Sequence, residues 1–129
     1  MDSINIDFFS ALNDAVSLLW QYGHRNIAFF GEKLTNETAC EFKNSISKLG
    51  CNNITVIESD KRFEEAGKDA VDKLLALTTD CTAIICAYDN IALGAIKQLK
   101  NKGLSVPDDI SIVGIDDIVI SKYAETSLT

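Results

Sequence analysis

The sequence predicts an α/β domain in which helices cover both faces of a parallel sheet, a three-layer sandwich of the Rossmann-like or flavodoxin-like kind. Helical spacing of apolar residues alternates with short apolar runs four times along the chain. The runs are apolar almost throughout rather than at every second position, so both faces of each strand are expected to be covered. With 129 residues and 47% hydrophobic content, the chain can bury one such core.

Each of the four units consists of a helix followed by a strand. Gly23, Gly50 and Gly103 are expected to end the first, second and fourth helices, because glycine readily adopts the left-handed conformation that follows a helix. Asp7, Thr35 and Asp89 precede helical segments and are suited to cap them. The predicted strands are residues 27–30, 54–57, 83–87 and 110–115, and the apolar helical faces lie within residues 8–22, 39–49, 66–74 and 91–99.

Polar loops follow all four predicted strands. Because ligands of such sheets bind beyond the carboxyl ends of the strands, these loops are where a binding site is expected. Their carboxylate, amide and hydroxyl groups suit hydrogen bonds to hydroxyls or purine edges, and Tyr88 adds a flat face. Loops are polar in most proteins, so position alone leaves a binding site and an ordinary solvated edge equally open. The loops are residues 31–33, 58–60, 88–90 and 116–117.

Composition argues against several classes of protein. The 12 basic and 19 acidic residues give a formal net charge of -7, which disfavours contact with nucleic acid by this domain. No apolar run approaches the roughly 20 residues of a membrane span, and no signal peptide is evident, so a cytoplasmic protein is expected. The 4 cysteines form no CxxC pair and have 1 histidine to join them, so we expect free thiols, no metal site and no cofactor.

Two further features are expected to be structural. His24 and Arg25 follow the end of a helix, where a cation is favourable, so His24 is expected to support the fold rather than react. Ala92, Gly94 and Ala95 are small enough to let their helix pack closely on the sheet or on a partner subunit.

Three segments of the sequence are more specific than the α/β fold alone requires. They read Gly-His-Arg-Asn-Ile-Ala-Phe-Phe-Gly at 23–31, Ala-Tyr-Asp-Asn-Ile-Ala-Leu-Gly-Ala-Ile at 87–96 and Val-Pro-Asp-Asp-Ile-Ser-Ile-Val-Gly-Ile-Asp-Asp at 106–117. In order and spacing they resemble the effector-binding domain of LacI/GalR transcription regulators over nearly the whole chain. The resemblance implies a periplasmic binding protein-like fold of type I. Residues 1–129 would form one lobe, with the first lobe and the helix-turn-helix absent from the chain.

The resemblance also implies a function and a set of partners. In LacI/GalR regulators two α/β lobes close on a sugar or purine and thereby move an attached helix-turn-helix on operator DNA. A small-molecule effector such as a sugar or purine, operator DNA bound only through the helix-turn-helix, and a homodimer of the full-length protein are therefore expected. The ligand-binding residues that follow for this chain are Thr38, Tyr88, Asp89 and Asp116.

Two of these residues depart from the family pattern. Thr38 stands where the family often has an arginine that binds sugar hydroxyls. Tyr88 replaces the usual asparagine and so exchanges an amide for an aromatic group. The effector is therefore expected to be a less typical sugar or another small polar metabolite, held partly by Tyr88 and Asp116.

Three other functions share some of these features. An exported sugar-binding protein of a transporter would use the same cleft, but the Gly-His-Arg and Val-Pro-Asp-Asp-Ile segments favour the regulator. A receiver domain needs an acidic pair after its first strand to hold magnesium, and residues 30–32 provide none. An enzyme would use Asp116 with Asp117, or Cys86 with His24. Neighbouring aspartates at the end of a strand point in different directions. His24 is the only possible base for Cys86 and is more than one strand away from it in the sequence. No catalysis is therefore expected.

Overall fold

The structure is a computed structural model that describes residues 2–51, 54–77, 80–106 and 108–115, with side chains from residue 12 onward. Helices and strands alternate along the chain, as the apolar pattern predicts. In order, the elements are α1 (Asp2–Gln21), β1 (Ile27–Glu32), the 3-10 helix η1 (Lys33–Thr35), α2 (Asn36–Lys48), β2 (Ile54–Ser59), α3 (Phe63–Leu77), β3 (Ala83–Cys86), α4 (Asp89–Asn101) and β4 (Ser111–Gly114).

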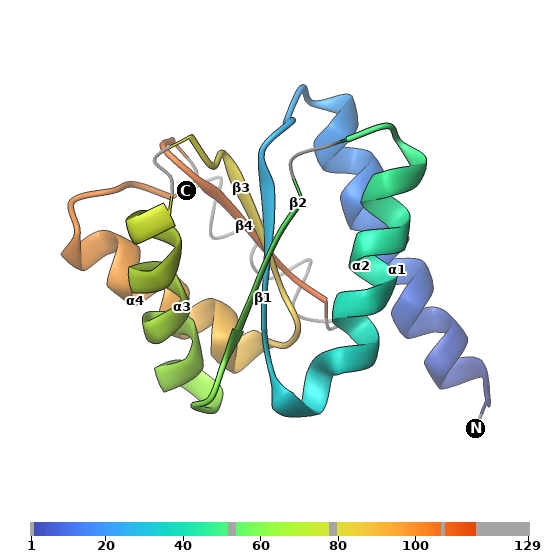
Figure 1. Cartoon of the computed structure of the whole chain (residues 1–129), viewed down its shortest axis with the longest axis horizontal. Helices are drawn as coiled ribbons and strands as arrows, with labels where there is room; N and C mark the ends of the chain where they lie inside the picture. Colours follow the sequence, from blue (N-terminus) through green and yellow to red (C-terminus); the bar gives the residue numbers. More distant parts are fainter. Residues whose placement is uncertain (1, 52–53, 78–79, 107, 116–129) are drawn as a thin grey trace.

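The four strands form one parallel sheet in the order β2-β1-β3-β4. Ile27 at the start of β1 lies opposite Ile54 of β2 and Ala83 of β3, so the three strands start at the same level. Helices α1 and α2 cover one face of the sheet, and α3 and α4 cover the other (Figure 1). The predicted three-layer α/β sandwich is confirmed.

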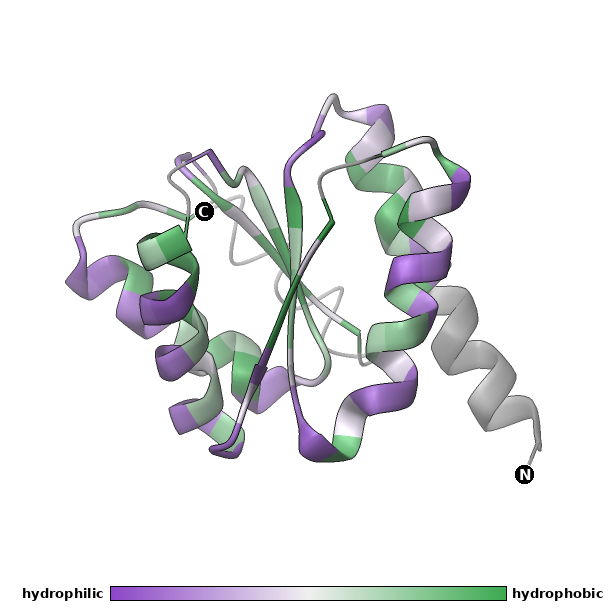
Figure 2. Cartoon of the chain, viewed as in Figure 1, coloured by the Kyte–Doolittle hydropathy of each residue, from purple (hydrophilic) through white to green (hydrophobic). Residues whose placement is uncertain are grey.

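The hydrophobic core lies on both faces of the sheet. All six residues of β1 are buried, and so are all four of β3, which is the burial expected of apolar strands covered by helices on both sides. The strands and the inward faces of the helices are apolar, whereas the outward faces of α2 and α3 are hydrophilic (Figure 2). The largest fully buried side chains include Phe29, Phe30, Phe42, Ile46, Leu74, Ile84, Ile85, Ile91 and Leu99.

The three predicted helix caps are not made as expected. Asp7 lies inside α1, because the helix already begins at Asp2 and no glycine or proline between these two residues interrupts it. Thr35 precedes α2, but its side chain makes no cap bond there and bonds the backbone of Glu32 instead. Asp89 is the first residue of α4 and Tyr88 takes the N-cap position, so the Asp89 carboxylate adds charge to the first turn, where the helix dipole favours an anion.

The cysteines differ in their exposure, and a small residue of α4 lies at a contact between two helices. Cys40 is exposed, Cys51, Cys81 and Cys86 are buried, and no two of these four residues form a disulfide. Gly94 of α4 packs against α3, which is neither of the two partners expected for the small residues of this helix. Among the described residues no helix is both long enough and apolar enough to cross a membrane.

Candidate functional site

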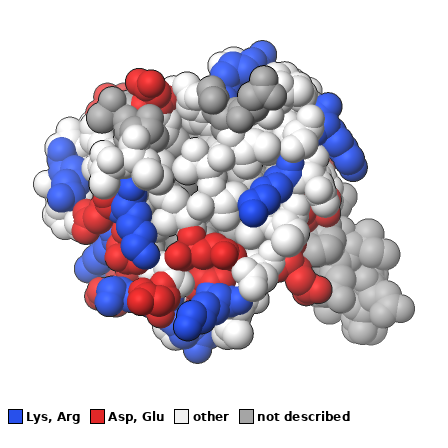
Figure 3. Space-filling view, in the orientation of Figure 1, with Lys and Arg blue, Asp and Glu red and all other residues white. Residues whose placement is uncertain are grey.

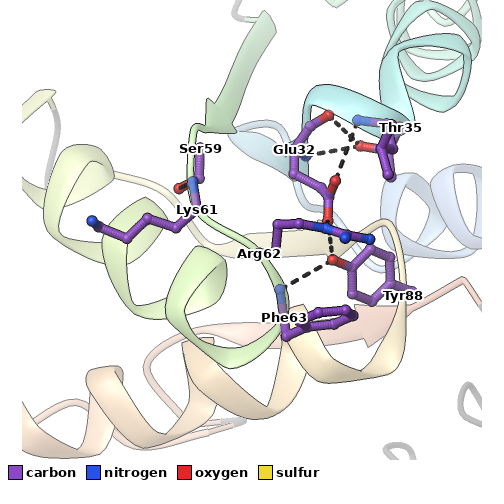
Figure 4. Close-up of polar contacts among 8 residues, drawn as sticks. Glu32, Thr35, Ser59, Lys61, Arg62, Phe63 and Tyr88 are labelled. Carbon is purple, nitrogen blue, oxygen red and sulfur yellow. Dashed lines mark hydrogen bonds and ion pairs between the residues drawn. The ribbon is translucent and has the colours of Figure 1, made fainter.

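The carboxyl ends of the parallel strands bring separate loops to one edge of the sheet, which we call the carboxyl edge. β1 ends at Glu32 and β2 at Ser59, while Tyr88 follows two residues after the end of β3. Acidic and basic side chains are mixed along this part of the surface, in the lower half of the view in Figure 3. A polar cluster of Glu32, Arg62, Phe63 and Tyr88 lies at this edge (Figure 4).

Glu32 is at the centre of the cluster. It is only 1% exposed, although it carries a carboxylate. Its Oε2 accepts hydrogen bonds from the Tyr88 hydroxyl and, at 3.3 Å, from Arg62 Nε, while its Oε1 accepts one from the backbone N–H of Leu34 at 3.3 Å. Both carboxylate oxygens are therefore satisfied by groups from three different loops, as buried polar groups require.

The environment of Glu32 favours its charged form. Burial alone would raise the pKa of this carboxyl, because it penalises the charge. The hydrogen bonds from Tyr88, Leu34 N–H and Arg62, together with the positive charge of Arg62, outweigh that effect and lower the pKa below its usual value. At neutral pH the cluster therefore contains a buried carboxylate paired with a cation.

Tyr88 links the carboxylate to the loop between β2 and α3. Its hydroxyl donates to Glu32 and accepts the backbone N–H of Phe63 at 3.1 Å. Burial and the hydrogen bond to Glu32 raise the pKa of the Tyr88 hydroxyl, so it stays protonated and remains a donor. The hydroxyl is thus engaged both as donor and as acceptor within the protein.

Arg62 and Phe63 form the exposed part of the cluster. The Arg62 guanidinium lies 4.6 Å from the centre of the Phe63 ring, and that ring lies 6.1 Å from the ring of Tyr88. Phe63 is 48% exposed and has a φ of 59°, a left-handed conformation that is uncommon for a bulky residue. Such strain is held in place by surrounding contacts and concentrates at binding sites, and here the bond from Phe63 N–H to Tyr88 supplies one of those contacts.

The start of the same loop is fixed from the other side. Ser59 Oγ donates to Asp69 Oδ2 of α3 at 2.7 Å and accepts the backbone N–H of Lys61 at 3.0 Å. The hydrogen bond from Ser59 and the pairing with Lys73 outweigh burial and lower the pKa of Asp69. The loop that carries Arg62 is therefore anchored to a helix at one end and to Tyr88 at the other.

The four residues expected to bind ligand fall in different places. Tyr88 and Asp89 lie at the carboxyl edge, at the start of α4. Thr38 lies in the first turn of α2 and is 6% exposed. Asp116 is outside the described residues, so the ligand-binding role of these four positions stays a prediction.

Sequence reasoning included Glu32 in a polar loop but did not single it out, and it overlooked Arg62 and Phe63. Glu32 did carry a signal, since it is a charged residue directly after an apolar strand. Arg62 carried another, because the chain contains only two arginines, Arg25 and Arg62. Neither signal showed that the two residues, which are 30 positions apart, form an ion pair.

The structure does not bring together Cys86 and His24, the thiol and the base considered for an enzyme. Cys86 is 0% exposed within β3, and burial raises the pKa of its thiol, so the reactive thiolate is disfavoured. His24 lies before β1, at the opposite edge of the sheet, where its Nδ1 is 2.8 Å from Thr82 Oγ1. Within the described part of the chain, no group of three or more His, Cys, Asp or Glu residues is placed to hold a metal ion.

Comparison with known proteins identifies the family. Residues 16–129 match the model of the periplasmic binding protein-like domain. The chain belongs to the periplasmic binding protein-like domain family. The resemblance to LacI/GalR transcription regulators is confirmed by relatives that are named as transcriptional repressors and by solved structures of LacI-type regulators.

Two curated relatives and one solved structure illustrate the match. The chain is 32% identical to the HTH-type transcriptional repressor CytR of Escherichia coli K12 over 136 residues, which cover 100% of this chain and 39% of CytR. It is 33% identical to catabolite control protein A of Priestia megaterium, over 98% of this chain and 40% of that protein. A LacI transcriptional regulator from a Rhodococcus species superposes with a TM-score of 0.77 at 26% identity, over 95% of this chain and 52% of that one. The chain thus spans about two fifths of the curated relatives' length.

Proposed function

We propose that this chain is the ligand-sensing lobe of a LacI-type transcription regulator and that it binds a small polar effector, a sugar, a purine or a related metabolite, at its carboxyl edge. The family membership supports a binding lobe of this type. The relatives named as transcriptional repressors support the regulatory role. The position of the polar cluster supports the site, because ligands of open parallel sheets bind at the carboxyl ends of the strands.

The observation that carries the proposal is the buried carboxylate of Glu32, which lies at the carboxyl edge among surface loops but is only 1% exposed. Taking a carboxylate out of water is costly unless it is paired and hydrogen-bonded. A sheet edge that serves only as solvated surface would not require a buried carboxylate such as that of Glu32. Here the carboxylate fixes residues from the loops after β1, β2 and β3 in a single network. Preorganised polar groups of this kind are what a specific small-molecule site requires.

Within this proposal the expected contact residues take distinct positions. Asp89 begins α4 at the carboxyl edge, and Asp116 follows the last described strand, so we propose that their carboxylates bind hydroxyl or amine groups of the effector. The ring of Tyr88 provides a flat face for contact with the effector. Thr38 has little surface for contact, since only 6% of it is exposed.

We further propose that operator DNA is bound by a helix-turn-helix in another part of the regulator and that the whole regulator acts as a homodimer. The formal net charge of -7 supports a domain that leaves contact with phosphates to another part of the protein. Closure of two lobes on the effector would then change the spacing of the DNA-binding domains.

A test of this proposal uses the protein produced from its complete gene. Thermal-shift and calorimetric titrations with neutral sugars, sugar acids and purine nucleosides measure effector binding, and gel-shift assays on the DNA upstream of the gene measure operator binding. We expect one compound to bind and to change the affinity for DNA. Binding of a sugar without any retention of DNA would instead support a sugar-binding protein of a transporter, and no binding in either assay would refute the sensing role.

A further inference from the structure

We infer that the guanidinium of Arg62 binds the effector at the carboxyl edge, and that Glu32 and Tyr88 are positioning residues that hold Arg62 and its loop in place. The inference rests on the proposed sensing function and extends it to a residue outside the predicted binding set. It also assigns the Tyr88 hydroxyl a supporting role rather than a direct contact.

The hydrogen-bonding groups of Arg62 are only partly used by the protein. A guanidinium has five N–H donors, and Nε engages Glu32 Oε2 at 3.3 Å. Among the described residues, the two terminal amino groups of Arg62 have no hydrogen-bond partner. The Arg62 side chain as a whole is 54% exposed.

Arg62 is nevertheless held in one orientation. The carboxylate of Glu32 fixes one edge of the guanidinium, and the central carbon of the guanidinium lies over the Phe63 ring, 4.6 Å from the ring centre. Figure 4 shows the guanidinium lying across the cluster, between Glu32 and Tyr88. Arginine loses less conformational freedom on binding when its planar fork is already oriented, so this arrangement suits a ligand contact.

Glu32 and Tyr88 have little left to offer a ligand directly. Glu32 is 1% exposed, and both of its carboxylate oxygens already accept hydrogen bonds from the protein. The Tyr88 hydroxyl donates to Glu32 and accepts from Phe63 N–H. Their contribution is therefore to orient Arg62 and the strained backbone of Phe63.

The geometry also indicates the chemistry of the ligand. The terminal amino groups of a guanidinium form parallel hydrogen bonds to two adjacent oxygen atoms, such as vicinal hydroxyls or a carboxylate. The half-exposed ring of Phe63 beside Arg62 provides an apolar surface for the C–H face of a sugar. A sugar or a sugar acid has both features, whereas a purine base lacks the paired oxygens.

The first experiment compares Arg62→Gln and Arg62→Lys with the wild type in the complete regulator. Calorimetric titration with galactose, ribose, glucuronate and adenine identifies the compound that binds the wild type. We expect Arg62→Gln to weaken its binding about 10- to 100-fold, as expected for loss of charged hydrogen bonds. Arg62→Lys restores the charge without the fork and should recover only part of the affinity.

Lys61→Gln is the matched control, because it removes the same charge from the adjacent position. The Lys61 side chain points away from Glu32 and Tyr88 in Figure 4. We expect this variant to change the affinity by no more than about twofold. If Arg62→Gln binds as tightly as Lys61→Gln, the role of Arg62 is refuted while the sensing function stands. If no compound binds the wild type, the sensing function fails and this inference fails with it.

The positioning roles have two separate readouts, of which the one for Glu32 needs no ligand. In the wild type, the Arg62 Nε–H signal in nitrogen-15 NMR should exchange slowly with water, because it is bonded to a buried carboxylate. Glu32→Gln should accelerate that exchange at least tenfold, and Tyr88→Phe should weaken effector binding through Arg62 although the ring is retained. If Glu32→Gln fails to fold, Tyr88→Phe alone decides. Unchanged affinity in that variant refutes the positioning role of Tyr88.

Discussion

Gly67 of α3 and Gly94 of α4 meet where the two helices pack, at a distance that leaves no space for a side chain on either. A Cβ atom at Gly94 would lie 2.0 Å from the carbonyl oxygen of Glu64, and one at Gly67 would lie 2.0 Å from the carbonyl oxygen of Ile91. Both obstructing atoms belong to backbone, which cannot rotate away as a flexible side chain can. The helix pair that covers this face of the sheet therefore depends on both glycines.

We predict that Gly94→Ala destabilises the domain by about 1–3 kcal/mol, the usual cost of overpacking. Alanine is a better helix former than glycine by about 1 kcal/mol, so helix propensity alone would give the opposite sign. Urea denaturation followed by circular dichroism measures the free energy of unfolding. Lys100→Ala, at an exposed position of the same helix, is the control and should change it by less than about 0.5 kcal/mol. A Gly94→Ala variant as stable as the wild type would show that the helices can separate without cost.

Tyr88→Phe is predicted to lower the free energy of unfolding by about 1–2 kcal/mol, because it deprives the Glu32 carboxylate and the Phe63 N–H of a partner. The pKa of Glu32 should rise, since the Tyr88 hydrogen bond is one of the contacts that lower it. Carbon-13 NMR of the carboxyl group as a function of pH measures this shift. Tyr22→Phe, at a side chain that is 75% exposed, is the matched control and should leave both quantities unchanged. An unaltered Glu32 pKa in Tyr88→Phe would contradict the hydrogen bond.

The arrangement of helices and strands could be predicted from the sequence because its signals are local. Apolar runs such as residues 83–87 and the glycines after α1, α2 and α4 show where strands and helix ends lie without reference to distant residues. The helix caps were harder to predict, since a hydroxyl has several possible partners. Thr35 bonds the backbone of Glu32 at 2.8 and 2.9 Å rather than the first turn of α2.

The polar cluster could be predicted only in part, because it depends on the order of the strands. The edge of the sheet follows from the alternation of helices and strands, and Tyr88 was expected there. Glu32 and Tyr88 are 56 residues apart and meet because β1 lies between β2 and β3. The sequence contains no local pattern that brings Arg62 to the same carboxylate. For the same reason, the small residues of α4 were recognised while the helix that contacts Gly94 was not.

The stability of the domain is predicted to fall as the pH is lowered from about 7 to 5, through the titration of His24. Burial lowers the pKa of His24 below its ordinary value of 6.5, so the unfolded chain takes up a proton at a higher pH than the folded one. Stability is therefore full above pH 6.5 and is lost as the pH falls toward the folded pKa. Because the chain has 1 histidine, His24→Gln should remove most of this slope. Urea denaturation at several pH values tests this, and an equal slope in the variant would refute it.

Thiol labelling is predicted to modify Cys40 rapidly and to leave the other three cysteines intact in the folded protein. Cys40 is exposed on α2, whereas Cys51 and Cys81 are 9% exposed and Cys86 is 0% exposed. Burial also raises the pKa of Cys81 and Cys86, which disfavours the thiolate that reacts. With Ellman's reagent at pH 8 we expect one fast equivalent, none in Cys40→Ser, and all four after unfolding in guanidinium chloride. A second fast equivalent in the native protein would mean that one of the strand-end thiols becomes accessible through local opening, which the packing around β1 and β3 argues against.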